Sequence, residues 1–286
     1  MIRLALTDLD NTLIPLHQGC ASERARAAIH AMLDAGLRFG PVTGRVPAAM
    51  RWMFAGDEAC HRTGAFVNGQ IIYVDGRLVH ELTIEGELLD EVARYLADWE
   101  GAALGLYDID RVAGISDGEV AYVGATAAEL ERHAHAFPRP YTVLAHVARP
   151  RYTKTNVRCD LAPERMGALT AGLRGRFGDD LAFVSPMAGG PFIDILPAGW
   201  DKGRAVEEIM GIVGLAPDEV AAFGDSENDL AMLAVVGHPV AVANATAEVV
   251  AASRWHIGDS ADDAVAGALA DIAAAAPTGG MPAFMV

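Results

Sequence analysis

The first 43 residues alternate between strand and helix patterns, which limits the chain to few folds. Residues 2–7 are an apolar run that ends at Asp8, as expected of a strand buried in a parallel sheet. Ser22 is a suitable N-cap for a helix whose apolar residues share one face and which stops at Gly36. Residues 37–43 then read as a second strand. A strand, a helix and a strand in this order predict a βαβ unit and therefore a parallel α/β sheet.

The same alternation returns near the end of the chain. Residues 192–196 and 220–223 have the pattern of strands, and residues 202–213 have the pattern of a helix between them. The intervening region mixes short strands and helices. We therefore predict a Rossmann-like, doubly wound core made of residues 1–82 and 191–286, with an α+β domain inserted at 83–190. The tail from about residue 273 is rich in Ala, Pro and Gly, and we expect it to be mobile.

The composition is that of a globular protein with a large core. Of the 286 residues, 52% are hydrophobic and 21% are charged. The 22 basic and 38 acidic residues give a net charge of −16, which argues against nucleic acid as a partner. Neither a signal peptide nor an apolar run of about 18 residues is present, so we expect no membrane association. Cys20, Cys60 and Cys159 are odd in number and far apart, which favours a reducing, cytoplasmic location.

Two acidic residues follow the first predicted strand directly, in the motif Asp8-Leu9-Asp10-Asn11-Thr12. Ligands of open parallel sheets bind beyond the carboxyl ends of the strands. If the extended backbone continues, Asp8 and Asp10 point the same way, and two such carboxylates need a divalent cation or a shared proton. A surface loop with an Asx turn at Asp10 is the alternative.

A second acidic cluster follows the strand predicted at 220–223. It is the segment Gly224-Asp225-Ser226-Glu227-Asn228-Asp229. Some of these side chains are expected to cap the next helix, whose dipole favours carboxylates at its start. The cluster also matches the oxygen-rich ligand set of a Mg²⁺ ion that meets a substrate phosphate.

Two further segments add groups that suit a phosphate. Thr43, Gly44 and Arg45 follow the second strand, where a hydroxyl and glycine amides can bind an anion. Lys202 opens a predicted helix; on its own it reads as an ordinary exposed lysine. Four aspartates (−4), Lys202 (+1) and one Mg²⁺ (+2) would sum to about −1 before phosphate binds. Such a balance suits phosphoryl transfer, in which positioning and charge neutralisation dominate.

Taken in order, these motifs resemble those of the haloacid dehalogenase (HAD) superfamily. The closest similarity is to the Cof-type phosphatases with a type IIB cap, because Asn228-Asp229 is followed by Met232 and by Asn244-Ala245. The long interval between Arg45 and Lys202 would hold this cap. Relatives often have Asn-Gly-Ala after the second motif, and we place Thr63-Gly64-Ala65 at that point, which would alter the pocket.

The resemblance implies a role for each motif residue. Asp8 would be the nucleophile and a metal ligand, and Asp10 the general acid and base, with its backbone carbonyl on the metal. Asp225 would bind the metal directly and Asp229 from the second layer of contacts. The groups that hold phosphate oxygens would be the Leu9 and Gly44 amides and the side chains of Thr43, Lys202 and Asn228.

The function expected from this resemblance is Mg²⁺-dependent hydrolysis of a small phosphate monoester through an aspartyl-phosphate. Sugar phosphates are the expected substrate class, and the expected partner is a small phosphorylated metabolite. Two alternatives stay open, a sugar phosphomutase and a catalytically silent sugar-phosphate-binding regulator. We expect a monomer or a homodimer.

Overall fold

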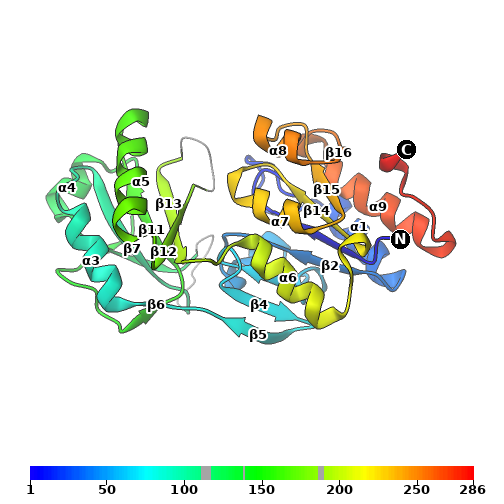
Figure 1. Ribbon diagram of the computed structural model, residues 1–286, viewed down its shortest axis with the longest axis horizontal. Coiled ribbons are helices and arrows are strands. Elements are labelled where there is room, and N and C mark those ends of the chain that lie inside the picture. The colour runs from blue at the N-terminus through cyan, green and yellow to red at the C-terminus, as the bar shows by residue number, and fades with distance from the viewer. Residues whose placement is uncertain (111–116, 138, 186–189) are drawn as a thin grey trace. The chain divides into compact units, whose positions relative to one another are not determined.

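The chain divides into two compact units in a computed structural model that describes residues 1–110, 117–137, 139–185 and 190–286 (Figure 1). The first unit combines Met1–Glu81 with Asp201–Val286, and the second is Leu82–Trp200. The second unit is thus inserted into the first. None of the helices in the described ranges is both long and apolar enough to cross a membrane.

A parallel sheet of five strands forms the centre of the first unit, in the order β16-β15-β14-β1-β2. All residues of β1 (Leu4–Thr7) and β14 (Val220–Gly224) are buried, so both faces of these strands are covered. The predicted βαβ start and parallel α/β core are confirmed. The other strands are β2 (Arg38–Pro41), β15 (His238–Ala241) and β16 (Trp255–His256).

Helices and a small antiparallel sheet complete this unit. The Ser22 hydroxyl accepts a hydrogen bond from the Ala25 amide and caps the first helix, as its position predicts. The helices are α1 (Glu23–Asp34), α2 (Met50–Met53), α6 (Lys202–Val213), α7 (Leu230–Val235), α8 (Ala247–Ala252) and α9 (Ala264–Ala275). The antiparallel strands are β3 (Gly64–Phe66), β4 (Ile71–Val74) and β5 (Arg77–Glu81), with the Asp75-Gly76 turn between the last two.

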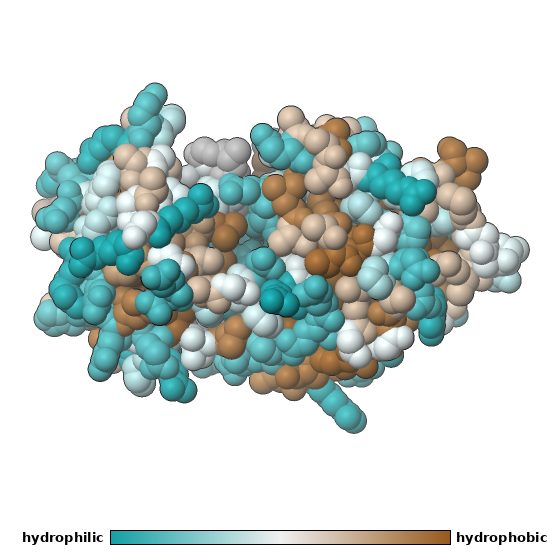
Figure 2. Space-filling model, viewed as in Figure 1, coloured by the Kyte–Doolittle hydropathy of each residue, from teal (hydrophilic) through white to brown (hydrophobic). Residues whose placement is uncertain are grey.

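Single apolar side chains remain exposed on this unit. Leu78 of β5 and Ile212 of α6 are 50% and 48% exposed. Figure 2 shows hydrophobic surface where β5 and the end of α6 lie in Figure 1. Isolated exposed apolar residues are normal on soluble proteins and need no ligand to explain them.

The C-terminal tail, for which the composition predicts mobility, contacts the first unit. Helix α9 continues to Ala275, and the chain then packs back onto the first unit. Met285 is only 5% exposed, and the rings of Phe284 and Phe223 lie 6.3 Å apart between centroids. The Ala-Pro-Gly composition of the tail gives no indication of these contacts, because Phe284 and Met285 are among its last three residues.

The second unit is an antiparallel-type sheet covered by helices. Its six strands lie in the order β12-β13-β11-β7-β8-β9, and α3 and α5 pack apolar side chains on one face. The strands of this sheet are β7 (Ala102–Asp108), β8 (Glu119–Val123), β9 (Thr142–Val143), β11 (Thr155–Cys159), β12 (Leu181–Val184) and β13 (Phe192–Pro197). Strands β6 (Ile84–Glu85) and β10 (Arg151–Tyr152) pair with each other in a separate two-stranded sheet. The helices are α3 (Gly86–Leu96), α4 (Ala127–Arg132) and α5 (Pro163–Phe177).

The second boundary of this unit lies later than predicted. The sequence pattern places the strand at 192–196 in the core, yet strand β13 pairs antiparallel with β11 and β12 in the inserted sheet. The unit therefore extends to Trp200 and not to residue 190. A short apolar strand carries no local signal for which of two sheets it joins, because pairing is decided by distant partners.

The environment of Cys159 in β11 predicts that its thiol reacts slowly with alkylating reagents. Cys159 is 1% exposed, and burial raises the pKa of its thiol to about 11. At pH 8 only about one part in a thousand is then thiolate, the reactive form. We expect an alkylating reagent to label the partly exposed Cys20 while sparing Cys159 at pH 8, with Cys159 labelling faster as pH rises toward 11. Peptide-level mass spectrometry measures both rates, and equal rates at pH 8 would contradict the expectation.

Candidate active site

Two acidic residues meet at the carboxyl edge of the parallel sheet. Asp8 follows β1 and Asp225 follows β14, and these strands are neighbours with Thr7 opposite Phe223. The Asp8 amide donates to the Phe223 carbonyl at 2.9 Å, which continues the strand pairing. Parallel register thus brings together two motifs that are more than 200 positions apart.

Lys202, the first residue of α6, reaches this edge with a fully buried side chain. Its Nζ donates to Asp8 Oδ1 and to Asp229 Oδ1, each at 2.6 Å. Burial lowers the pKa of Lys202, but Asp229 and Asp8 outweigh burial and raise the pKa above its ordinary value. Burial also raises the pKa of Asp8 well above its ordinary value, and Lys202 offsets only part of that rise. Lys202 is therefore a buried cation shared by two carboxylates, and not a surface lysine.

Asp229 fixes the loop that follows β14. Its Oδ2 accepts hydrogen bonds from the Asp225 amide at 2.9 Å and the Ser226 amide at 3.1 Å, while its Oδ1 accepts from Lys202. Both oxygens of this fully buried carboxylate are thus occupied by donors of the chain. Asp229 is thus the third residue after the N-cap Ser226, the position at which a capping box needs an acceptor side chain.

Gly224 leaves the space that Asp229 occupies. A Cβ on Gly224 would lie 2.6 Å from the Asp229 Cβ and 2.8 Å from its Cγ. We expect Gly224→Ala to displace Asp229 and lower the free energy of unfolding by roughly 1–3 kcal/mol, as overpacked sites do. Urea unfolding measures the change. Gly211→Ala is the matched control, because its Cβ meets nothing within 4 Å inside α6, and it should stabilise by up to about 1 kcal/mol. Equal effects of the two substitutions would contradict the steric argument.

Asp225 is held by the first motif. The Asn11 amide donates to Asp225 Oδ2 at 2.8 Å, and the Thr12 hydroxyl donates to Asp225 Oδ1 at 2.9 Å. Asn11 has a φ of 65°, a left-handed backbone that asparagine tolerates better than most residues. Asn244 secures this loop by donating to the Asn11 carbonyl at 2.8 Å. Burial, followed by the charge of Asp229, raises the pKa of Asp225 to about 6.

Asp10 lies apart from this buried group and pairs with Arg45. The Arg45 guanidinium donates to both Asp10 oxygens, at 2.8 Å from Nε and 2.7 Å from a terminal nitrogen. The side chain of Arg45 is 33% exposed and that of Asp10 is 44% exposed. Sequence reasoning left Arg45 between a solvated role and a substrate contact, and did not foresee this bidentate pair.

Asn68 is the site residue that sequence reasoning missed. Its amide hydrogen-bonds to the Thr43 carbonyl at 2.9 Å, and its side-chain Oδ1 accepts from Asn228 at 3.2 Å. Val67 and Asn68 both have a φ of 52°, and this is strained for a β-branched valine. The missed signal is the Asn68-Gly69 pair before β4. The Thr63 hydroxyl, by contrast, accepts a hydrogen bond from the Asp75 amide at the hairpin, at 3.1 Å.

Three carboxylates at the sheet edge form a group that suits a divalent cation. Oxygen atoms of Asp8, Asp225 and Asp229 all lie within 4.8 Å of one another. With Lys202 the group carries a formal charge of −3 + 1 = −2 when all three are ionised, which one divalent cation would balance. Hard oxygen donors are also the ligands that Mg²⁺ prefers.

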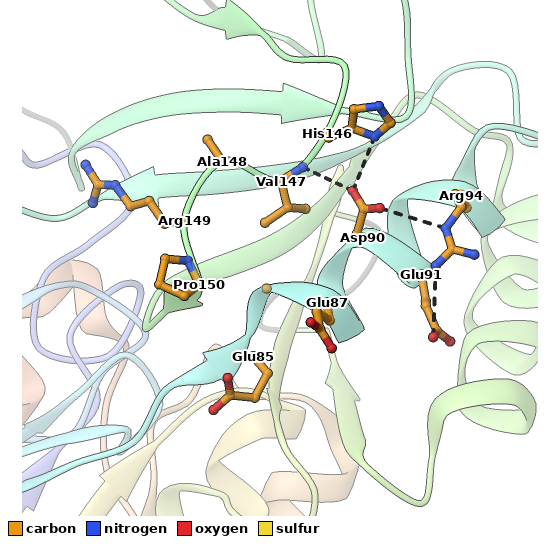
Figure 3. Close-up of a pocket in the computed structure, with 11 residues that line it drawn as sticks. Glu85, Glu87, Asp90, Glu91, Arg94, His146, Val147, Ala148, Arg149 and Pro150 are labelled. Carbon is orange, nitrogen blue, oxygen red and sulfur yellow. Dashed lines mark hydrogen bonds and ion pairs between the residues drawn. The ribbon is translucent and has the colours of Figure 1, made fainter.

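A separate cavity of about 600 Å³ lies within the second unit (Figure 3). None of the predicted site residues lines it. Its acidic side chains are largely paired: Asp90 accepts from the Val147 amide at 3.1 Å, and Arg94 lies 3.9 Å from both Asp90 and Glu91. Several of the acidic side chains that line this cavity are therefore engaged by other groups of the second unit.

Known proteins share both the fold and parts of the sequence. The structure of SMU.1108c from Streptococcus mutans aligns with a TM-score of 0.79 and 18% identity, over 96% of this chain and 100% of that one. A sugar phosphatase of HAD subclass IIB, BT4131, aligns with a TM-score of 0.69 and 16% identity, over 92% and 96%. At these identities the likeness establishes the fold.

Several sequence relatives are phosphatases by name. The chain is 35% identical over 122 residues to a phosphoglycolate phosphatase of Halorubrum lacusprofundi, which is 43% of this chain and 52% of that protein. It is 25% identical over 250 residues to an HMP-PP phosphatase of Yersinia enterocolitica, covering 86% and 85%. Matches to two further phosphatases span only 22% and 27% of their lengths.

A family model described as haloacid dehalogenase-like hydrolase matches residues 5–269, nearly the whole span from β1 into α9. The match includes the whole second unit, most of the first unit and all of the motif residues discussed above. The resemblance inferred from the motifs is therefore confirmed, and the chain belongs to the haloacid dehalogenase-like hydrolases.

Proposed function

We propose that the protein is a Mg²⁺-dependent phosphatase that hydrolyses small phosphate monoesters through an aspartyl-phosphate on Asp8. The observation that carries this proposal is the buried cluster at the sheet edge, in which Lys202 bridges Asp8 and Asp229 beside Asp225. Such a cluster is costly to fold, and it is what a site needs to bind a dianion and a divalent cation together.

Asp8 performs the covalent step in this proposal. One carboxylate oxygen attacks phosphorus, and the bond from phosphorus to the ester oxygen breaks as the alcohol leaves. Asp10 gives a proton to that alcohol and later takes one from the water that attacks the aspartyl-phosphate. This second attack releases inorganic phosphate and restores the Asp8 carboxylate.

Asp10 must leave Arg45 to act in this way. The guanidinium occupies both oxygens of Asp10, so in this arrangement neither oxygen faces a leaving alcohol or an attacking water. Because both side chains are partly exposed, they can separate without opening the core. Arg45 is then released to meet the anionic substrate.

The phosphate would be held by groups around the same edge. Thr43 is 1% exposed, and its hydroxyl already accepts from the Arg45 amide at 3.2 Å. Asn228 supplies a side-chain amide that Asn68 orients at 3.2 Å. The remaining donors are the Leu9 and Gly44 backbone amides and the Lys202 ammonium.

Asp8 and Asp225 are the carboxylates that would hold Mg²⁺, together with the Asp10 backbone carbonyl. Asp229 would not contact the ion but would position Lys202 and the loop at Asp225, because Lys202 and two backbone amides occupy its oxygens. When bound, the ion neutralises charge on the carboxylates and on the phosphate.

Sugar phosphates are the proposed substrate class, and the second unit is proposed to be a type IIB cap that selects among them. Support comes from the fold shared with a subclass IIB sugar phosphatase and from relatives named for phosphorylated small molecules. The test is phosphate release from a panel of sugar phosphates and phosphoglycolate, with Mg²⁺ and with excess chelator. Release that requires Mg²⁺ supports the proposal, and no release from any ester by the folded protein contradicts it.

The same panel separates the two alternative functions. A phosphomutase would interconvert sugar phosphate isomers without net phosphate release and would require a bisphosphate activator, which phosphorus NMR detects. A regulator would bind a sugar phosphate, measured by calorimetry, and leave it unchanged. The presence of every acid, base and cation that turnover needs favours the phosphatase over the silent regulator.

A further inference from the structure

A second group of possible metal ligands lies away from the sheet edge, between α1 and the short 3-10 helix η2 (Glu58–His61). His30 extends from α1, Cys60 belongs to η2, and Asp57 directly precedes η2. One donor atom of each residue lies within 4.8 Å of the other two. We propose that His30, Asp57 and Cys60 bind a borderline divalent cation such as Zn²⁺.

The donor set differs in kind from that of the catalytic cluster. It offers an imidazole nitrogen, a carboxylate oxygen and a sulfur, which together suit Zn²⁺ or Co²⁺ and not Mg²⁺. A thiolate and a carboxylate supply two negative charges, which balance a divalent ion when the imidazole is neutral. Burial and the neighbouring Asp57 raise the pKa of the Cys60 thiol to about 12, and Arg26, which donates to the Phe54 carbonyl at 3.5 Å, offsets part of that rise.

The present contacts show that the three side chains already converge. The His30 Nε2 lies 2.7 Å from Asp57 Oδ2, and the Cys60 thiol donates to the same carboxylate. Zinc bonds of 2.0–2.3 Å place neighbouring donors about 3.3–3.8 Å apart, so closing the site needs movements of about 1 Å. His30 is 46% exposed and can move, whereas Cys60 is fully buried and fixed.

The ion would enter from the exposed side and replace the hydrogen-bonding protons. The thiol proton leaves to solvent, and a water molecule fills the fourth position of a tetrahedral site. Bound there, the ion links α1 to the segment that connects β2 with β3. A ligand that binds only the folded state stabilises it by mass action, so metal should raise the melting temperature.

Cobalt titration of the metal-stripped protein tests this proposal, with excess Mg²⁺ present to occupy the oxygen site. We expect one equivalent of Co²⁺ to give a thiolate-to-cobalt charge-transfer band and tetrahedral d–d bands. The band should vanish in Cys60→Ser, and His30→Gln should weaken binding at least tenfold. Zn²⁺ should displace Co²⁺ and raise the melting temperature of the wild type more than that of either variant.

Matched controls locate the sulfur and guard against misfolding. Cys20→Ser and Cys159→Ala should keep the band, and His17→Gln should keep the affinity. If Cys60→Ser fails to fold, His30→Gln decides alone, because its side chain is half exposed and circular dichroism verifies its fold. Absence of the band in the wild type, its persistence in Cys60→Ser, or unchanged affinity in His30→Gln would overturn the proposal.

Discussion

Asp8→Asn is expected to abolish phosphate release while the protein remains folded. Asparagine keeps the volume of Asp8 but cannot form an acyl-phosphate, and loss of a nucleophile costs roughly 10³-fold or more in turnover. Lys202 retains its 2.6 Å contact with Asp229, so the buried cation keeps one partner. Initial rates with the best ester from the panel, measured at saturating Mg²⁺, give the ratio of turnover numbers.

Asp179→Asn is the matched control for this change. Asp179 is exposed, and the same chemical substitution there should leave turnover unchanged. Phosphate binding to Asp8→Asn, followed by calorimetry, separates loss of chemistry from loss of the site. Turnover of Asp8→Asn within tenfold of the wild type would exclude Asp8 as the nucleophile and would point to hydrolysis by a directly attacking water.

Much of the catalytic cluster could be predicted because its members are tied to local signals. Asp8 and Asp225 each follow a fully buried strand, and parallel strands bring their carboxyl ends to one edge whatever lies between them in sequence. The hairpin at Asp75-Gly76 and the helix cap at Ser22 are likewise determined by a few adjacent residues. Such short-range patterns survive in any tertiary context.

Other features depended on contacts that no local pattern encodes. The pair of Arg45 with Asp10 joins residues 35 positions apart, and Asn68 reaches Asn228 across 160 positions. Strand β13 joins the inserted sheet because β11 and β12 offer it antiparallel partners, not because of its own composition. Taken alone, Lys202 reads as a surface lysine, and only the resemblance assigns it to the site, because the two carboxylates that contact it come from distant segments.

Lys202→Met should cause the largest loss of stability among single substitutions at the site. It leaves Asp8 and Asp229 buried without the ammonium that lies 2.6 Å from each. Removing one partner of a buried ion pair costs about 3–5 kcal/mol, because the remaining charge stays desolvated. Methionine matches the length of the lysine stem, so the packing of α6 changes little. Urea unfolding in the presence of chelator gives the free energy of unfolding without any contribution from bound metal.

A double-mutant cycle with Asp229→Asn shows whether this loss is electrostatic. If the lysine acts mainly by compensating carboxylates, the double variant should be more stable than the sum of the two single losses, with a coupling of about 0.5–3 kcal/mol. Additive losses would mean that Lys202 stabilises the fold by packing alone.

Turnover should be lost in Lys202→Met even at low temperature, where the variant is folded, because one cation that holds the phosphate is gone. A folded Lys202→Met with normal turnover would restrict Lys202 to a structural role and leave phosphate binding to the backbone amides and Thr43.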